Sequence, residues 1–365
     1  DKTEYIYKLI HTSTPYFLSR PRRFGKSLLL STMKAYWEGK KELFKGLKIE
    51  ELERDNPEAF QAYPVFYFDL NRENYNVKEA LEGILEDHLS DWESRYSVVP
   101  TEKQSLAVRF RRVILEAVRQ TGKKCVVLVD EYDQPLRGNI EDKELIEHNK
   151  AVFKGFFSVL KSEDAHLRFV FITGITKFTK GSIFSDLNQL EDISFDDDYS
   201  CICGITEDEM FRYLSPEISG MARDLSLKDA ECIEQLRRTY DGYRFSAYGV
   251  NVYNPFSLLL ALKKRRFGSF WFESGTPTFL LERLKEIDFD IRLIDERRIQ
   301  AKESQLSDYR DDNPDPVPLL YQAGYLTLTD YDKRRMTFRL GFPNEEVKYG
   351  FLERLMPVYT GNEND

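Results

Sequence analysis

The chain has 365 residues, of which 41% are hydrophobic and 14% aromatic, and its formal net charge at pH 7 is −9. This composition excludes a disordered chain, and the negative charge argues against a protein that coats nucleic acid through a generally basic surface. The length exceeds the usual size of one domain and predicts two or three domains. No hydrophobic run approaches the roughly 20 residues of a membrane span, and residues 1–10 do not have the hydrophobic region of a signal peptide.

The cysteines indicate the compartment. None of them forms a C-x-x-C pair, and all lie in or beside hydrophobic segments. They are Cys125, Cys201, Cys203 and Cys232. Cys201 and Cys203 alternate with hydrophobic residues in a run that we interpret as strand-like, with a packing role and not a metal-binding one. Buried, reduced thiols are therefore expected, and the sequence predicts a soluble, cytoplasmic, globular protein without a membrane partner. Because the chain does not begin with Met, we also expect that an N-terminal piece is missing.

The first predicted elements are a strand, a loop and a helix. Residues 15–19 (PYFLS) form a short hydrophobic run that predicts a buried strand. The loop RPRRFGKS follows at 20–27, and hydrophobic residues at helical spacing then predict a helix that ends at Gly39. The loop completes the pattern G-x-x-x-x-G-K-[ST], although Arg20 stands where that pattern has its first glycine.

Strands and helices continue to alternate up to about residue 204. Hydrophobic runs predict strands near 63–70 and 125–129 and within LRFVFITGITKF (167–178), with amphipathic helices between them and an irregular stretch after the last. Five strands alternating with helices predict a parallel α/β sheet with right-handed crossovers. With the loop at 20–27, the pattern predicts the sheet of a P-loop NTPase.

The pattern changes after residue 204. A capping box at Thr206 and Glu209 predicts the first of several short helices that continue to about residue 262. A later short helix is followed by two alternating segments, 325–329 and 336–340, whose hairpin pattern predicts a winged helix. We therefore predict three domains. They are a P-loop ATPase-like α/β domain at 1–204, a helical lid region at 205–265 and a winged-helix-like domain at 266–365.

The loop at 20–27 carries the groups that polyphosphate binding requires. Backbone N–H groups, the positive end of a helix and the Lys26 ammonium are expected to contact phosphate, and the Ser27 hydroxyl is expected to bind Mg²⁺. The predicted nucleotide-binding residues are Arg23, Phe24, Gly25, Lys26 and Ser27. Arg20 is expected to change the shape of the loop entrance, because side chains disfavour positive φ.

A second motif supports the first, which is a weak signal alone. CVVLVDE (125–131) predicts a strand that ends in Asp130 and Glu131, the Walker B arrangement. There the first acid orients hydrated Mg²⁺ and the second polarises the attacking water. Helix-capping acids at a solvated strand end are the alternative. Thr173, at the end of its own strand, is predicted either to sense γ-phosphate and hold the water or simply to cap that strand.

Other polar residues carry weaker signals. Asp69 is more typical of a loop start than of a site, and His88 of a core histidine than of a catalyst. The run KKRR at 263–266 fits either a solvated cluster or a contact with a phosphate backbone. Pro314-Asp315 and Glu346-x-Lys348 spell the letters of a PD-(D/E)XK nuclease. We reject that site, because each acid is expected to precede or begin a helix instead of lying on a hairpin.

Taken together, these motifs resemble the bacterial AAA-ATPase-like family, whose members often carry a PD-(D/E)XK nuclease domain after the ATPase part. The similarity spans nearly the whole chain, through segments such as VDEYDQPL, FITGITKF, YDGYRF and LGFPNEEV. In that family RPRRFGKS is a usual form of the loop. The resemblance therefore implies an intact nucleotide site at residues 25–27, 130–131 and 173, a lead-in before this chain and a nuclease domain after it.

The sequence predicts an ATPase that binds ATP and Mg²⁺, turns over slowly without a partner, and couples nucleotide state to movement of its C-terminal parts and to regulation of a nuclease. The alternative is a nucleotide-gated switch that binds DNA through the winged helix, or binds protein, and a scaffold without hydrolysis is favoured least. The sequence does not decide whether the chain forms a homo-oligomer or whether it prefers ATP or GTP. It also does not identify the arginine finger, for which Arg168, Arg244 and the Arg22/Arg23 pair are candidates.

Overall fold

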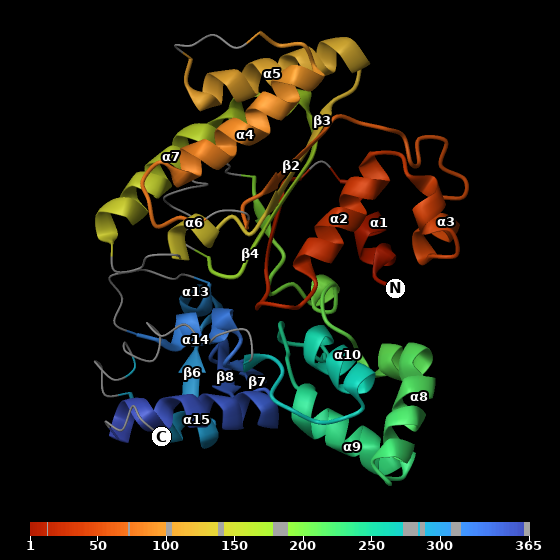
Figure 1. The fold of residues 1–365 in the computed structure, drawn as a ribbon, viewed down its shortest axis with the longest axis vertical. Helices are drawn as coiled ribbons and strands as arrows, with labels where there is room; N and C mark the ends of the chain where they lie inside the picture. Colours follow the sequence, from red (N-terminus) through yellow and green to blue (C-terminus); the bar gives the residue numbers. More distant parts are fainter. Residues whose placement is uncertain are drawn as a thin grey trace. The chain divides into compact units, whose positions relative to one another are not determined.

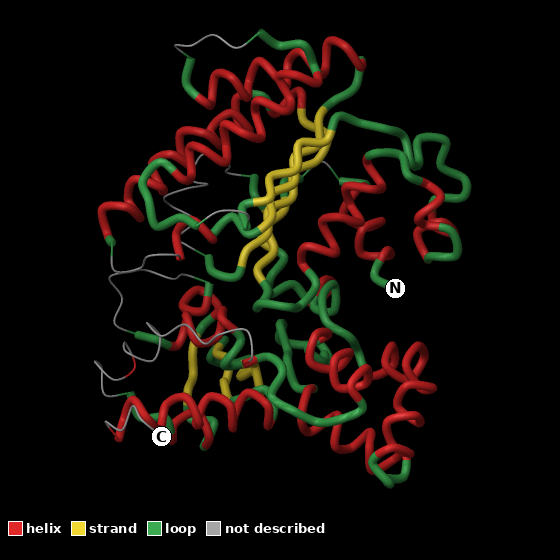
Figure 2. The backbone as a smooth tube through the Cα atoms, viewed as in Figure 1, coloured by secondary structure: helices red, strands yellow, loops and turns green. Residues whose placement is uncertain are grey.

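The chain divides into two compact units (Figures 1 and 2). A computed structural model describes residues 1–12, 14–71, 74–99, 104–137, 142–177, 189–272, 284, 289–307 and 315–360. For residues 355–360 it describes the backbone alone. Unit 1 comprises Asp1–Ser19 and Lys26–Ile193, and unit 2 comprises Arg20–Gly25 and Ser194–Asp365. The first part of the loop at 20–27 therefore belongs to unit 2, and Lys26 begins the return to unit 1.

A five-stranded sheet forms the centre of unit 1 and confirms the predicted parallel α/β architecture. Its strand order is β2-β3-β4-β1-β5, and every neighbouring pair is parallel. The strands are β1 Tyr16–Ser19, β2 Val65–Asp69, β3 Cys125–Asp130, β4 Leu167–Gly174 and β5 Glu191–Asp192. All six residues of β3 are buried, as expected of a central parallel strand that is covered on both faces.

Helices cover both faces of this sheet, with α4, α5 and α7 on one side and α1, α2 and α3 on the other (Figure 1). The helices of unit 1 are α1 Thr3–Ile10, α2 Lys26–Trp37, η1 Lys41–Phe44, α3 Lys48–Leu52, α4 Ala80–Arg95, α5 Leu106–Thr121, α6 Gln134–Arg137, α7 Lys143–Ser162 and η2 Asp164–His166. Local signals set their ends. Ser105 caps α5 through a bond from the N–H of Val108, and Gly122 ends it with φ of 67°.

Aromatic packing joins β2 to its helical layer. The Phe68 ring lies 4.8 Å from Trp92 and 5.4 Å from Phe110, between centroids, and Phe110 stacks on Phe156 at 5.1 Å. His88 stacks on Trp92 at 5.5 Å, at the edge of this core, so its surroundings agree with the predicted core histidine.

Unit 2 begins with a turn-rich segment and three helices. The segment contains η3, Asp197–Tyr199, and Cys201 to Cys203 follow it in turns, so our interpretation of these residues as strand-like is wrong. All four cysteines are nevertheless buried free thiols. The helices are α8 Glu207–Asp224, α9 Asp229–Tyr240 and α10 Pro255–Lys264, and the predicted capping box of Thr206 and Glu209 is present.

The rest of unit 2 contains a small antiparallel sheet in the order β6-β8-β7. The strands of this sheet are β6 Ile299–Ala301, β7 Thr327–Asp332 and β8 Thr337–Gly341. The helices in this part of unit 2 are α12 Arg292–Asp295, α13 Glu303–Leu306, α14 Val317–Ala323 and α15 Glu345–Thr360. The predicted hairpin is thus present as β7 and β8. Residues 317–322 of α14 are all buried, and Tyr321 stacks on Phe195 at 5.5 Å. The winged-helix assignment and the boundaries at 204 and 265 stay predictions.

The described residues also bear on the predictions about nucleases and membranes. Asp315 precedes α14 and Glu346 lies in the first turn of α15, in agreement with the rejection of the nuclease motif, while Pro314 lies outside the described residues. Within the described part of the chain, no helix is both long enough and hydrophobic enough to cross a bilayer.

Candidate nucleotide-binding site

The loop between β1 and α2 has two residues in the left-handed region. Gly25 has φ of 93°, and Arg23 has φ of 66°. The positive φ is the reason for glycine at position 25. Lack of space is not, because a Cβ placed there would meet nothing within 4 Å. Arg20 itself has no positive φ, so the changed shape expected at the loop entrance stays a prediction.

The Arg20 side chain is a structural part of unit 2. Its guanidinium is buried and donates hydrogen bonds to the carbonyl oxygens of Ser194 at 2.9 Å and Tyr199 at 3.1 Å. It also lies 4.2 Å from the ring centroid of Phe245. Burial lowers the pKa of this guanidinium below its ordinary value. Arg20 thus fixes the loop entrance where the usual pattern has a small residue.

Arg23 and Phe24 also contact aromatic rings of unit 2. The Arg23 guanidinium lies 3.6 Å from the ring centroid of Phe256. Phe24 is buried and makes edge contacts with Tyr243 at 4.7 Å and Phe245 at 5.3 Å, between ring centroids. The side chain of Phe24 is therefore a packing group, and its backbone N–H is the group suited to phosphate.

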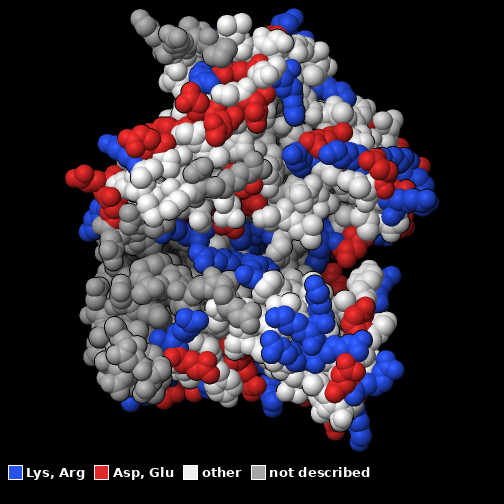
Figure 3. All heavy atoms as spheres, in the orientation of Figure 1, with Lys and Arg blue, Asp and Glu red and all other residues white. Residues whose placement is uncertain are grey.

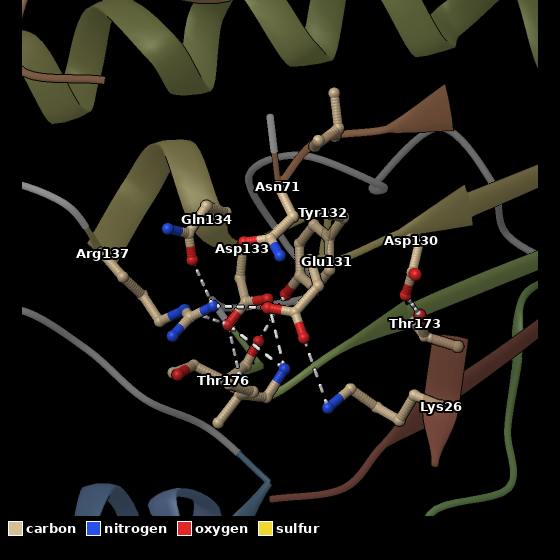
Figure 4. Close-up of polar contacts among 12 residues, drawn as sticks. Lys26, Asn71, Asp130, Glu131, Tyr132, Asp133, Gln134, Arg137, Thr173 and Thr176 are labelled. Carbon is tan, nitrogen blue, oxygen red and sulfur yellow. Dashed lines mark hydrogen bonds and ion pairs between the residues drawn. The ribbon is translucent and has the colours of Figure 1, made fainter. Parts of the chain in front are cut away.

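Lys26 begins α2 and points toward the Walker B acids (Figure 4). Its Nζ lies 3.5 Å from Oε1 of Glu131, and both side chains are largely buried. Ser27, the next residue, is exposed at the first turn of the same helix. The positive end of α2, the Lys26 ammonium and the Ser27 hydroxyl therefore lie within one turn, as phosphate binding requires.

Asp130 lies where the ends of three neighbouring strands meet. Its Oδ1 accepts a hydrogen bond of 2.8 Å from the Thr173 hydroxyl on β4, and its Oδ2 accepts one of 3.2 Å from the Tyr67 hydroxyl on β2. The structure thus brings together the predicted residues Asp130 and Thr173. It adds Tyr67, whose only signal in the sequence was a polar hydroxyl two residues before the end of its strand.

Glu131 follows β3 with φ of 53°, a conformation that is strained for a residue with a side chain. Besides Lys26, it contacts the guanidinium of Arg137, whose Nη2 lies 2.9 Å from Oε2 of Glu131. Arg137 ends α6, the short helix that follows Walker B. This basic partner was not predicted, although VDEYDQPLR places it six residues after the glutamate.

Asp133 is a third residue, after Tyr67 and Arg137, that the sequence did not predict at this site. It is fully buried and accepts hydrogen bonds from the N–H groups of Ile175 at 3.2 Å and Thr176 at 2.7 Å, just after β4. Gly174 makes this approach feasible, because a Cβ there would lie 2.7 Å from Oδ1 of Asp133. The Walker B turn is therefore tied to the end of the strand that carries Thr173.

Two of the arginines considered as fingers, Arg168 and Arg244, donate hydrogen bonds to main-chain carbonyls. Arg168 donates to the carbonyl oxygens of Ile10 at 3.0 Å and Thr12 at 3.1 Å, and Arg244 donates to main-chain carbonyls of residues 246 and 247. Asp69 accepts from the N–H of Asn71 at 3.1 Å, as a loop start does. None of these contacts points to a role in hydrolysis.

The donor set at this site fits magnesium. Among the described residues no group of three or more His, Cys, Asp or Glu side chains is arranged to hold a metal ion. Mg²⁺ does not need such a group, because it binds nucleotides through one or two protein oxygens, the phosphates and water. The Ser27 hydroxyl and the Asp130 carboxylate are the hard oxygen donors that the site offers.

A parallel sheet in which Gly-Lys-Ser begins the helix after one strand, and two acids end another, defines a P-loop NTPase. The chain belongs to the family described as "Predicted AAA-ATPase", which matches residues 1–184. A similar protein is the "Uncharacterized protein in vnfD 5'region" of Azotobacter chroococcum mcd 1, which is 37% identical over 361 residues. The match covers 98% of this chain and 66% of that relative, so the chain spans somewhat less than two thirds of its length.

Two solved structures were also compared. Cdc6p from Pyrobaculum aerophilum is 12% identical with a TM-score of 0.29, and the match covers 96% of this chain and 88% of that one. The ORC2 protein of Aeropyrum pernix, solved as ADPNP-ADP complexes, is 10% identical with a TM-score of 0.31, and the match covers 97% of this chain and 91% of that one.

Proposed function

We propose that this chain is a Mg²⁺-dependent ATPase. The observation that carries the proposal is the convergence of Lys26, Glu131 and the hydrogen-bonded pair of Asp130 and Thr173 at one edge of the parallel sheet (Figure 4). Lys26 binds the β- and γ-phosphates, Ser27 and Asp130 hold the metal, and Glu131 polarises the attacking water. Bound Mg²⁺ supplies neutralisation of the charge that develops on the phosphate oxygens.

The contact between Lys26 and Glu131 explains how nucleotide binding prepares the site. The 3.5 Å separation is that of an ion pair, so the Glu131 carboxylate is one of the groups that attract the Lys26 ammonium. A triphosphate carries more negative charge than one carboxylate and attracts the ammonium more strongly. Binding therefore moves Lys26 toward phosphate and leaves the Glu131 carboxylate available to a water molecule.

Thr173 acts on the metal site through Asp130. Its hydroxyl donates to the Asp130 carboxylate at 2.8 Å, which fixes the orientation of the oxygen that is to face the metal. The hydrogen bond favours a role for Thr173 in orienting the Asp130 carboxylate over a role in holding the attacking water. Hydrogen bonds of this kind tune the geometry and affinity of a metal ligand.

The division of the loop between the two units supports coupling of nucleotide state to unit 2. Arg20, Arg23 and Phe24 pack on groups of unit 2, whereas Lys26 begins a helix of unit 1. A change in the loop backbone on nucleotide binding therefore acts on residues of both units. The same observation favours the second candidate function, a nucleotide-gated switch whose output is the state of unit 2.

The same proposal includes regulation of a nuclease domain, location in the cytoplasm, slow turnover without a partner and assembly of several copies.

DNA binding is proposed for the basic positions of unit 2. The run 263–266 is exposed at the C-terminal end of α10, the helix over which Figure 3 shows Lys and Arg side chains gathered. Exposed arginines and lysine also occupy the β7–β8 turn at 333–335.

Phosphate release from MgATP tests the proposal. Wild type, Lys26→Ala and Glu131→Gln are compared, with nucleotide binding followed through the melting temperature. An ATPase requires turnover by wild type, loss of both binding and turnover in Lys26→Ala, and binding without turnover in Glu131→Gln. Nucleotide-dependent stabilisation of wild type without any phosphate release would instead establish the switch.

A further inference from the structure

Arg137 contacts three side chains around the Walker B turn (Figure 4). Its Nη2 lies 2.9 Å from Oε2 of Glu131 and donates to Oε1 of Gln134 at 2.7 Å, and its Nε lies 2.8 Å from Oδ2 of Asp133. Only 12% of the Arg137 side chain is exposed. The planar guanidinium, with several donors in a fixed arrangement, is suited to hold several acceptors in this way.

The contact with Asp133 fixes the position of this guanidinium. Asp133 is fully buried and takes hydrogen bonds from the N–H groups of Ile175 and Thr176, so it cannot turn toward another partner without losing them. Arg137 is the cation that lies against its carboxylate. Movement of Arg137 away would leave a buried charge uncompensated, which is costly.

Glu131, by contrast, lies between one cation that can leave and one that cannot. Lys26 is 3.5 Å from Oε1 and is the group that phosphate attracts, whereas Arg137 is held by Asp133. Of these two cations, only Arg137 then stays beside the Glu131 carboxylate once Lys26 contacts phosphate. The φ of 53° at Glu131 shows that the backbone also holds this residue in a conformation it would not adopt freely.

We propose that Arg137 is a positioning residue that holds the Glu131 carboxylate in place for hydrolysis after Lys26 has moved to phosphate. The inference rests on the proposed ATPase function and assigns a role in it to a residue outside the two Walker motifs. Arg137 acts through Glu131 and does not itself contact the nucleotide. Its loss should therefore affect kcat and not the affinity for MgATP.

The test compares phosphate release by wild type, Arg137→Gln and Arg137→Lys. We expect kcat of Arg137→Gln to fall by at least about tenfold while KM for MgATP stays within about threefold, and Arg137→Lys to recover part of kcat. Arg119→Gln is the matched control, because Arg119 makes an exposed ion pair with Glu116 on α5 and should keep full activity. An Arg137→Gln variant with the kcat of wild type would overturn the inference.

Arg137→Gln leaves the Asp133 charge buried and can impair folding, so a second variant separates the two effects. Asp133→Asn with Arg137→Gln removes the carboxylate and the cation together. A folded double variant with low kcat and unchanged KM supports the positioning role, whereas recovery of kcat shows that Arg137 merely balances Asp133. Absence of turnover in wild type would refute the proposed ATPase function itself. Turnover at the wild-type rate in Arg137→Gln would refute only the role of Arg137.

Discussion

The hydroxyl of Thr173 donates a hydrogen bond of 2.8 Å to Oδ1 of Asp130, joining the ends of β4 and β3. The parallel register pairs Val129 with Ile172, so the next residue of each strand lies at the same edge of the sheet. Both side chains are buried. The bond therefore orients the proposed metal ligand from a neighbouring strand.

Substitution of Thr173 by Val should weaken magnesium binding. Valine keeps the shape of threonine but removes the donor, and leaves Asp130 with the Tyr67 hydroxyl at 3.2 Å. We expect the Mg²⁺ concentration for half-maximal phosphate release to rise about tenfold and the free energy of unfolding to fall by about 1 kcal/mol. A magnesium titration of the ATPase rate measures the first effect.

The control for this variant is Thr32→Val. Thr32 lies on the exposed face of α2 and donates to the carbonyl of Leu28 at 2.7 Å, so its loss removes a hydroxyl without touching the site. An unchanged magnesium dependence in Thr173→Val would leave Thr173 as a strand-capping residue.

Gly174 should not tolerate alanine. The added Cβ would lie 2.7 Å from Oδ1 of Asp133 and 2.7 Å from ring carbons of Tyr132, both of which are buried. We expect a loss of about 2 kcal/mol or more in the free energy of unfolding, measured by urea denaturation. Gly155→Ala on α7 is the matched control. It meets nothing within 4 Å and should be neutral or stabilise the helix, so equal losses at both glycines would contradict the steric explanation.

The sequence could predict most of the sheet, because β1, β2, β3 and β4 are largely unbroken hydrophobic runs that polar residues or turns bound. β5 could not be found in this way, since Glu191 and Asp192 are both acidic and pair with β1 only through the fold. The error at Cys201 to Cys203 has a similar origin. The alternation of cysteines with hydrophobic residues was interpreted there as a strand, but all three residues are buried in turns, where tertiary contacts override the local pattern.

The candidate site divides along the same line. Lys26, Asp130 and Glu131 belong to local motifs and could be predicted, whereas Tyr67 depends on the register between β2 and β3. Arg137 depends on the helical turn of α6, which brings residue 137 back to residue 133. Contacts of this kind arise from strand register and chain reversal, which spacing alone does not encode.

Restoring the missing glycine at position 20 should harm the protein. Arg20 donates to carbonyls 174 and 179 residues away, in unit 2, and its guanidinium packs on Phe245. Arg20→Gly leaves both carbonyls without this donor and opens a cavity, so we expect a loss of about 3 kcal/mol or more in stability and a lower melting temperature. Arg22→Gly, at an exposed position two residues on, is the control. An Arg20→Gly variant as stable as wild type would show that the guanidinium is dispensable.

Asp241 should make the stability of the protein fall as the pH rises from about 4 to 6. Burial raises the pKa of its carboxyl to about 6, and its Oδ1 lacks a hydrogen-bond partner among the residues that the structure describes. Below the unfolded pKa both states are protonated, so the group has no effect. As the pH rises to about 6, the unfolded chain releases the proton first, and stability is lost by at most about 3 kcal/mol.

Asp241→Asn removes this titration and tests it by urea denaturation between pH 4 and pH 8. The variant should gain stability relative to wild type at pH 8 and lose that advantage at pH 4, because only the ionised carboxylate is unfavourable in the fold. Glu217→Gln, which removes an acid at an exposed position on α8, is the control variant. A constant difference between Asp241→Asn and wild type would mean that Asp241 ionises as readily in the folded chain as in the unfolded one.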